Sequence, residues 1–148
     1  MKTTLRCLTA IMFLSLSSCM QSVYKAPFII GEPECVIGEV DSFFRYAGII
    51  LDFCNTSEKQ IMNIEISFSL FDPETKKSPW YGTSHIMTNY ENSILTGEKI
   101  EICVSLDTYL YEIPKNAFLV KNLCISALTY SDGSVWKDYL GIYTVDSN

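Results

Sequence analysis

The sequence predicts an all-β fold, namely a two-sheet antiparallel β-sandwich of about seven strands. From residue 35 onward, apolar and polar side chains alternate with a period of two, and Ile, Val, Tyr, Phe and Thr are dense. Turn residues at 55–57, 72–73, 96–97 and 132–133 divide this part of the chain into short runs. Because no stretch has the 3.6-residue period of a convincing amphipathic helix, the pattern favours sheets alone.

The clearest strand is expected over residues 61–71. Its inward face carries Ile64, Ile66, Phe68 and Leu70, and the residues between them are polar. One apolar face and one polar face are typical of an antiparallel sheet with one side in water. The other strands expected before the last hairpin are 35–40, 46–54, 83–90 and 99–106, the last with Ile102 and Val104 inward. Short strands separated by turns favour a sandwich of the immunoglobulin-like type.

A hairpin is expected near the end of the chain, because Asp132-Gly133 between two β runs favours a two-residue type I′ turn. This turn would pair Ser131 with Ser134 and set the register of the hairpin. The face predicted to lie in the core carries Leu123, Ile125, Ala127, Thr129, Trp136, Leu140 and Ile142, with Asp138 as an exception. The opposite, outward face carries Leu128, Tyr130, Tyr139 and Tyr143. A cluster this apolar is expected either to bind a partner or glycan or to be covered by residues 20–31.

The N-terminus has the layout of an export signal. Lys2 and Arg6 precede an apolar run over residues 8–16, and small residues follow before Cys19. The run is shorter than the ~20 apolar residues that a membrane-spanning helix needs. A cleaved signal is therefore favoured over a permanent transmembrane anchor.

The segment Leu16-Ser17-Ser18-Cys19 resembles the lipobox of bacterial lipoproteins, in which the cysteine is acylated and the signal is removed in front of it. The resemblance implies a signal peptide at 1–18, a lipidated cysteine and tether at 19–34, and a β-sandwich domain at 35–148. Acyl chains on Cys19 would hold the domain on a membrane of the bacterial cell envelope, outside the cytoplasm. The alternative is an ordinary cleaved signal with an incidental cysteine.

A second resemblance covers roughly residues 46–137. The runs 55–57, 64–72 and 130–134 resemble those of small FxLYD-like sandwich modules found on bacterial exported proteins. Such modules have no established catalytic site, so this resemblance implies a fold and no functional residue.

Charge argues against nucleic acid as a partner. Loss of Lys2 and Arg6 with the signal would leave 9 basic residues against 17 acidic ones, a net charge of −8. A phosphate backbone would be repelled, and no clustered basic stripe offsets this. Anionic headgroups would be repelled as well, which leaves the acyl chains as the main membrane attachment.

The residue types that carry most catalytic chemistry are sparse. His85 is the single histidine, in a weak strand with no acid or nucleophile placed beside it by spacing. Asp72 and Glu74 flank Pro73, and a turn explains all three. The chain has no glycine-rich phosphate loop and no Cys-x-x-Cys pair. We therefore expect a protein that is not an enzyme, with no cofactor and no metal.

The cysteines of an exported domain can form disulfides. A hairpin turning near residues 44–45 would place Cys35 opposite Cys54 and permit a bond between them. Cys103 and Cys124 are expected on different sheets with their thiols pointing apart. The alternative is that all four remain thiols.

Aromatic residues suggest where binding would occur. Trp80-Tyr81, Tyr109-Leu110-Tyr111 and the outward tyrosines of the last hairpin offer flat rings with polar tips. Such a platform suits an envelope protein as partner, and the alternative ligand is a carbohydrate such as peptidoglycan. We therefore expect a non-catalytic binding or accessory module. A purely structural role for these rings, as cross-strand pairs, is the competing interpretation.

Overall fold

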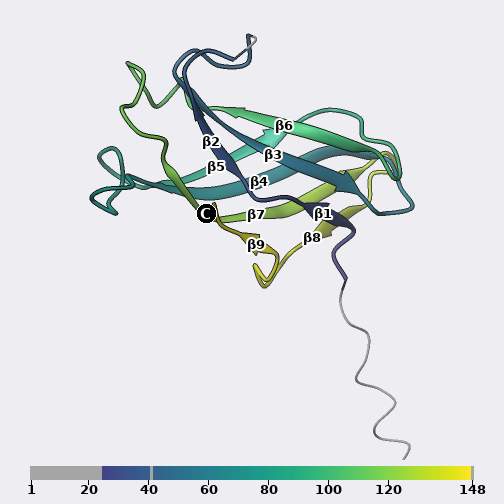
Figure 1. Cartoon of the computed structure of the whole chain (residues 1–148). Helices are drawn as coiled ribbons and strands as arrows, with labels where there is room; N and C mark the ends of the chain where they lie inside the picture. The colour runs from purple at the N-terminus through teal and green to yellow at the C-terminus, as the bar shows by residue number, and fades with distance from the viewer. Residues whose placement is uncertain (1–24, 41, 148) are drawn as a thin grey trace, which may run out of the picture.

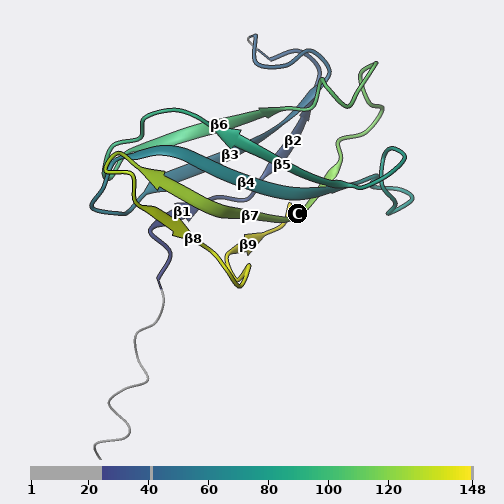
Figure 2. The same ribbon diagram turned by 180° about the vertical axis from the view of Figure 1, so that it is seen from behind.

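The computed structural model describes residues 25–40 and 42–147, and within them the fold is all-β (Figures 1 and 2). The nine strands are β1 (Phe28–Ile30), β2 (Glu34–Ile37), β3 (Ala47–Asn55), β4 (Ile61–Phe71), β5 (His85–Tyr90), β6 (Lys99–Ser105), β7 (Leu119–Tyr130), β8 (Val135–Lys137) and β9 (Thr144–Val145). They form two antiparallel sheets packed face to face, which confirms the predicted sandwich. The described residues contain no helix that could cross a membrane.

The first sheet is centred on β3, which pairs with β6 along one side. Its other side pairs with two short strands in succession, β1 opposite residues 53–55 and β2 opposite residues 47–50. Between them the Gly31 N–H donates to the Asp52 carbonyl at 2.9 Å, so hydrogen bonding continues across the break. We call β1 and β2 together the N-terminal edge.

The second sheet has the order β5-β4-β7, and the outer side of β7 pairs with both β8 and β9. We call β8 and β9 together the C-terminal edge. Because each edge is one interrupted strand, the nine strands occupy seven positions, in agreement with the number predicted. The chain changes sheets between β3 and β4, between β5 and β6, and between β6 and β7, as in immunoglobulin-like sandwiches.

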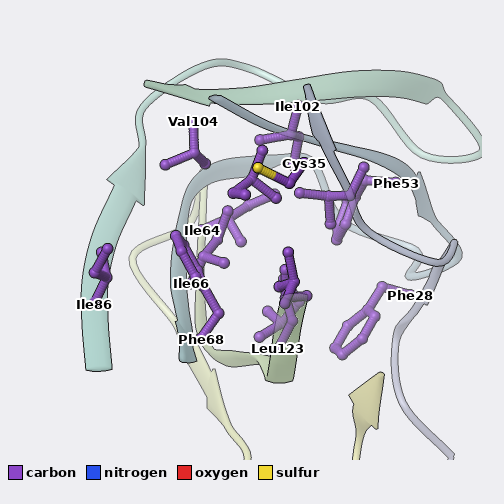
Figure 3. Packing of buried hydrophobic residues seen from close by; sticks show 14 of the residues in the cluster. Phe28, Cys35, Phe53, Ile64, Ile66, Phe68, Ile86, Ile102, Val104 and Leu123 are labelled. Carbon is purple, nitrogen blue, oxygen red and sulfur yellow. The ribbon is translucent and has the colours of Figure 1, made fainter. Parts of the chain in front are cut away.

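The core fills the space between the sheets (Figure 3). The predicted core residues Ile64, Ile66, Phe68, Ile102, Val104, Leu123 and Ile125 are all buried. Each fully buried aliphatic or phenyl side chain contributes roughly 1.5–3 kcal/mol relative to an exposed one. The period-two pattern therefore identified the inward face of β4 and β6 correctly.

The last hairpin differs from its predicted register by one residue. Thr129 pairs with Val135, so the loop spans three residues, 131–133. Of these three, Gly133 has positive φ, 80°, whereas a type I′ turn needs two such residues. The predicted two-residue turn is therefore wrong, and a three-residue loop with a glycine bulge replaces it.

A β-bulge in β7 reverses the predicted faces beyond it. The pairing with β4 includes Ile125 and Ala127 but skips Ser126, which is the extra residue. Alternation restarts after the bulge, and Leu128 and Tyr130 are buried at 0% and 8% exposure. The prediction that these two side chains face outward is therefore wrong.

The C-terminal edge is interrupted by a loop over residues 138–143. Asp138 fixes this loop, because its carboxylate accepts the N–H groups of Leu140 at 3.2 Å and Tyr143 at 3.1 Å. The chain leaves the ladder here and rejoins it only at β9. Leu140 and Ile142, predicted to lie in the core, are consequently exposed.

The folded part of the chain begins before residue 35. Phe28 on β1, in the segment assigned to the tether, is buried and lies between the two edges. Its ring centroid is 5.8 Å from that of Phe53, 5.3 Å from that of Trp136 and 6.0 Å from that of Tyr143. Trp136, predicted inside, is half-buried in this contact.

The four cysteines in the described part of the chain are free thiols. Cys35 pairs with Ile49 in the ladder, because the turn between β2 and β3 comes earlier than expected. The predicted opposition of Cys35 and Cys54 is therefore wrong. Cys103 lies in the first sheet and Cys124 in the second.

Candidate binding surfaces

Three loops meet at one end of the sandwich, which we call the loop end. They are residues 38–46, 72–84 and 106–118. The first and third are joined by Asp107, whose carboxylate oxygens accept the N–H groups of Arg45 at 2.8 Å and Tyr46 at 2.9 Å. Both of these loops lie at the top of Figures 1 and 2. Charge-assisted hydrogen bonds of this kind fix one loop relative to the other.

Trp80 ties the second loop to the third. Its ring stacks on Tyr109 at a centroid distance of 5.4 Å and meets Phe118 edge-on at 6.1 Å. The indole N–H donates to the Thr83 carbonyl at 2.9 Å, which closes the turn within its own loop. The structure thus brings together two of the aromatic runs that the sequence singled out, 80–81 and 109–111.

Large apolar side chains stand in water at the loop end. Tyr81 and Tyr111 are fully exposed, Phe43 is 61% exposed and Ile113 is 55% exposed. Burial of such surface by a partner is favourable by roughly 25 cal/mol per Å². Because hydrogen bonds and ring contacts already join the loops that carry these side chains, little further ordering of the loop backbones is needed on binding.

The tyrosine face predicted on the last hairpin is not one surface. Leu128 and Tyr130 are buried, Tyr143 is half-buried against Phe28, and Tyr139 points into water. The flat platform on which the carbohydrate hypothesis rested is therefore divided between the core and a loop.

A second exposed apolar surface lies where the described chain begins. Tyr139, Leu140 and Ile142 project from loop 138–143, and Ile29 projects from β1 nearby. A groove of about 470 Å³ runs between β1 and β9. We call these four side chains the tail-side surface.

Potential catalytic and metal-binding groups are dispersed in the described residues, where no group of three His, Cys, Asp or Glu residues could hold a metal ion. His85 is exposed at the start of β5, with its Nδ1 atom 3.5 Å from the Ser69 hydroxyl. The Asp72 carboxylate accepts hydrogen bonds within its own turn. Hydrogen bonds from Thr75, and a weaker one from the Glu74 N–H, lower the pKa of this carboxyl. The structure does not bring His85 and Asp72 together into a reactive pair.

Sequence reasoning missed part of the loop end. For Phe43 a signal was present, because adjacent phenylalanines in a turn cannot both face inward. Phe44 is buried with its ring over Gly48, and Phe43 is left in solvent. For Ile113, the following Pro114 marked a segment outside any strand. A strand-based reading assigns apolar residues to the core, so exposed loop residues escape it.

No protein-family model matches the sequence, and no curated protein does. Among solved structures, the chain is similar to a hypothetical protein from Peptoclostridium difficile 630. The two share 13% sequence identity with a TM-score of 0.55, over 78% of this chain and 88% of that one. At this identity the likeness establishes a shared fold alone, and what the surfaces bind is inferred from the residues of this chain.

Proposed function

We propose that the protein is a lipid-anchored, non-catalytic binding domain of the bacterial cell envelope, attached through Cys19, whose loop end binds a protein partner. The observation that carries the proposal is the set of exposed aromatic and aliphatic side chains on three loops that are fixed to one another. Aromatic anchors on preorganised loops are typical of protein-binding surfaces.

The position of the chain start supports this arrangement. Lys25 lies six residues after Cys19 and lines the groove beside β9. The described chain begins at the bottom of Figures 1 and 2, whereas loops 38–46 and 106–118 lie at the top. A domain anchored through Cys19 would therefore present these two loops away from the membrane. Two or more acyl chains would suffice to hold it there.

The binding function is tested by affinity capture from solubilised envelopes. Tyr111→Ser combined with Phe43→Ser removes two exposed anchors without touching the core. Val135→Ser is the matched control, because Val135 is half-exposed at the far hairpin. We expect wild type and the control to retain a stoichiometric protein partner that the double variant loses. Equal retention by all three would contradict the proposal, and loss of cell-wall glycan instead would support the carbohydrate alternative.

The anchor is tested separately by mass spectrometry of the native protein and by membrane partition. We expect an acylated N-terminal Cys19 and a Cys19→Ser variant that no longer partitions with membranes. An unmodified mature protein, or unchanged partition of the variant, would overturn the anchor and leave the loop-end test intact.

A further inference from the structure

The loop over residues 138–143 carries an exposed apolar tip, and hydrogen bonds within the loop fix its conformation. Tyr139 is 86% exposed and Leu140 is 81% exposed, while Ile142 is exposed beside them. The two carboxylate oxygens of Asp138 accept backbone N–H groups from within the loop, and Gly141 adopts a left-handed φ of 60°. The side chains are therefore presented by a defined turn.

This loop lies beside the start of the described chain. One groove is lined both by Lys25 and Ala26 and by residues 142–145. The loop between β8 and β9 projects at the bottom of Figures 1 and 2, on the side where the described chain begins. Any attachment that acts through residues before Lys25 thus acts next to this loop.

The chain between the proposed anchor and Lys25 is short. Six residues reach at most about 20 Å even when fully extended. Acyl chains on Cys19 would place that residue at the headgroup layer, which is roughly 5–8 Å thick on each side of the bilayer. The tail-side surface is then held within a few residues' reach of the membrane.

The chemistry of the loop suits a lipid surface. Tyrosine favours the boundary between headgroups and hydrocarbon, because its ring is apolar and its hydroxyl remains hydrated. Insertion of leucine and isoleucine side chains there is favourable, because it removes their apolar surface from water. Lys25 lines the groove beside β9, and Lys137 lines a second groove together with Asp138 and the apolar side chains of the loop, so basic groups lie at this surface although the domain as a whole is acidic.

We propose that Tyr139, Leu140 and Ile142 insert into the interfacial layer of the bilayer and set the orientation of the domain on the membrane. This inference rests on the proposed anchor at Cys19. It assigns a lipid surface as the occupant of the tail-side surface, and it turns loops 38–46 and 106–118 toward the opposite side.

The test uses the full acylated protein reconstituted into phosphatidylcholine vesicles with and without lipids brominated on the acyl chains. Leu140→Trp places a fluorescent reporter at the loop tip, and Tyr111→Trp is the matched control at the loop end, since both positions are exposed. The emission added by each variant is read against wild type, which contains Trp80 and Trp136.

We expect bromine to quench most of the emission added by Leu140→Trp and to shift it to the blue, with no quenching of the emission added by Tyr111→Trp. Vesicle flotation in the same samples reports the anchor. Protein that floats while Leu140→Trp stays unquenched would overturn the loop insertion and leave the anchor standing. Protein that does not float would overturn both. Emission from Leu140→Trp that is blue-shifted but unquenched would indicate cover by residues 20–24 or a second copy, and would also overturn the proposal.

Discussion

Both sheets carry one interrupted edge strand, and the two interruptions have opposite results. The N-terminal edge breaks over residues 31–33, and the Gly31 hydrogen bond to Asp52 carries the ladder across. The C-terminal edge breaks over residues 138–143, and Asp138 draws the backbone of that stretch into a loop. A break of three residues keeps the edge closed, whereas a break of six presents side chains to solvent. In this fold the shorter break therefore serves the core, and the longer one serves the surface.

Either interruption also protects the protein. A long, regular edge strand invites pairing with another chain, and breaks, short strands and bulges prevent this. The two edges meet at Phe28, whose contacts with Trp136 and Tyr143 join the first sheet to the second. The roles of the two edges can therefore be tested by substitutions at their junction, beside or within each edge, and in the hairpin loop that leads into the C-terminal edge.

The largest loss of stability is expected where the two edges join. Phe28→Ala removes a buried ring that contacts both sheets, and we expect a loss of about 3 kcal/mol in the free energy of unfolding. Chemical denaturation measures this. Ile29→Ala is the control, because Ile29 is mostly exposed, and it should change stability by less than about 0.5 kcal/mol. A loss for Phe28→Ala as small as the one expected for Ile29→Ala would show that β1 is not part of the core.

A smaller loss of stability is expected on β3, beside the N-terminal edge. A Cβ added at Gly48, opposite Val36 of β2, would lie 2.3 Å from two ring carbons of Phe44. Gly48→Ala should therefore destabilise the protein by about 1–3 kcal/mol through overpacking. Combining it with Phe44→Leu should cost less than the sum of the two single changes. Additive losses would mean that the ring does not lie over this glycine.

A substitution in the C-terminal edge should destabilise the protein less than the two changes above. Asp138→Ala removes the acceptor of two backbone hydrogen bonds, and we expect about 1 kcal/mol of destabilisation together with faster proteolysis within residues 138–143. Asp138→Asn keeps one side-chain oxygen and should show an intermediate rate of cleavage. A loss as large as that of Phe28→Ala would contradict the distinction drawn between the two edges.

The smallest effect concerns the hairpin loop before the C-terminal edge. The Lys59 ammonium, 2.7 Å away, and the hydroxyl and N–H of Ser134 hold the pKa of Asp132 well below its ordinary value. A carboxyl with a lowered folded-state pKa stabilises the fold above its unfolded pKa of about 3.9 and loses this as pH falls through the folded-state value. Asp132→Asn should lower Tm slightly at pH 7, and the difference should shrink below pH 4. A pH-independent difference would exclude this linkage.

The sequence predicted the regular interior of the fold well. The bounds of the strand over residues 61–71 are those predicted, and its alternating apolar face is the inward face of β4. The pairing of β4 with β5 is continuous, and a strand paired in this way leaves a clear period of two in its residues. The fold class therefore followed from the sequence, as did most of the core of β4 and β6.

The faces of the last hairpin could not be predicted in the same way. A Ser-Asp-Gly-Ser run fits a two-residue turn and a three-residue loop with a glycine bulge equally well. The bulge at Ser126 has no pattern of its own, because Ala127 and Leu128 on its far side are both apolar. Each irregularity exchanges the two faces, so one unseen bulge moved Leu128 and Tyr130 from the surface to the core.

The buried thiol on β2 provides a measure of how often the domain opens. Burial raises the pKa of Cys35 more than the Phe118 N–H, which donates to its sulfur at 3.3 Å, lowers it. Little thiolate exists at neutral pH, and separation of β2 from the loop before β7 would expose the sulfur further. The alkylation rate of Cys35, divided by its rate in denaturant, thus sets an upper limit on the equilibrium constant for that local separation. A thiol buried in the N-terminal edge can therefore be used to follow local opening of the sandwich.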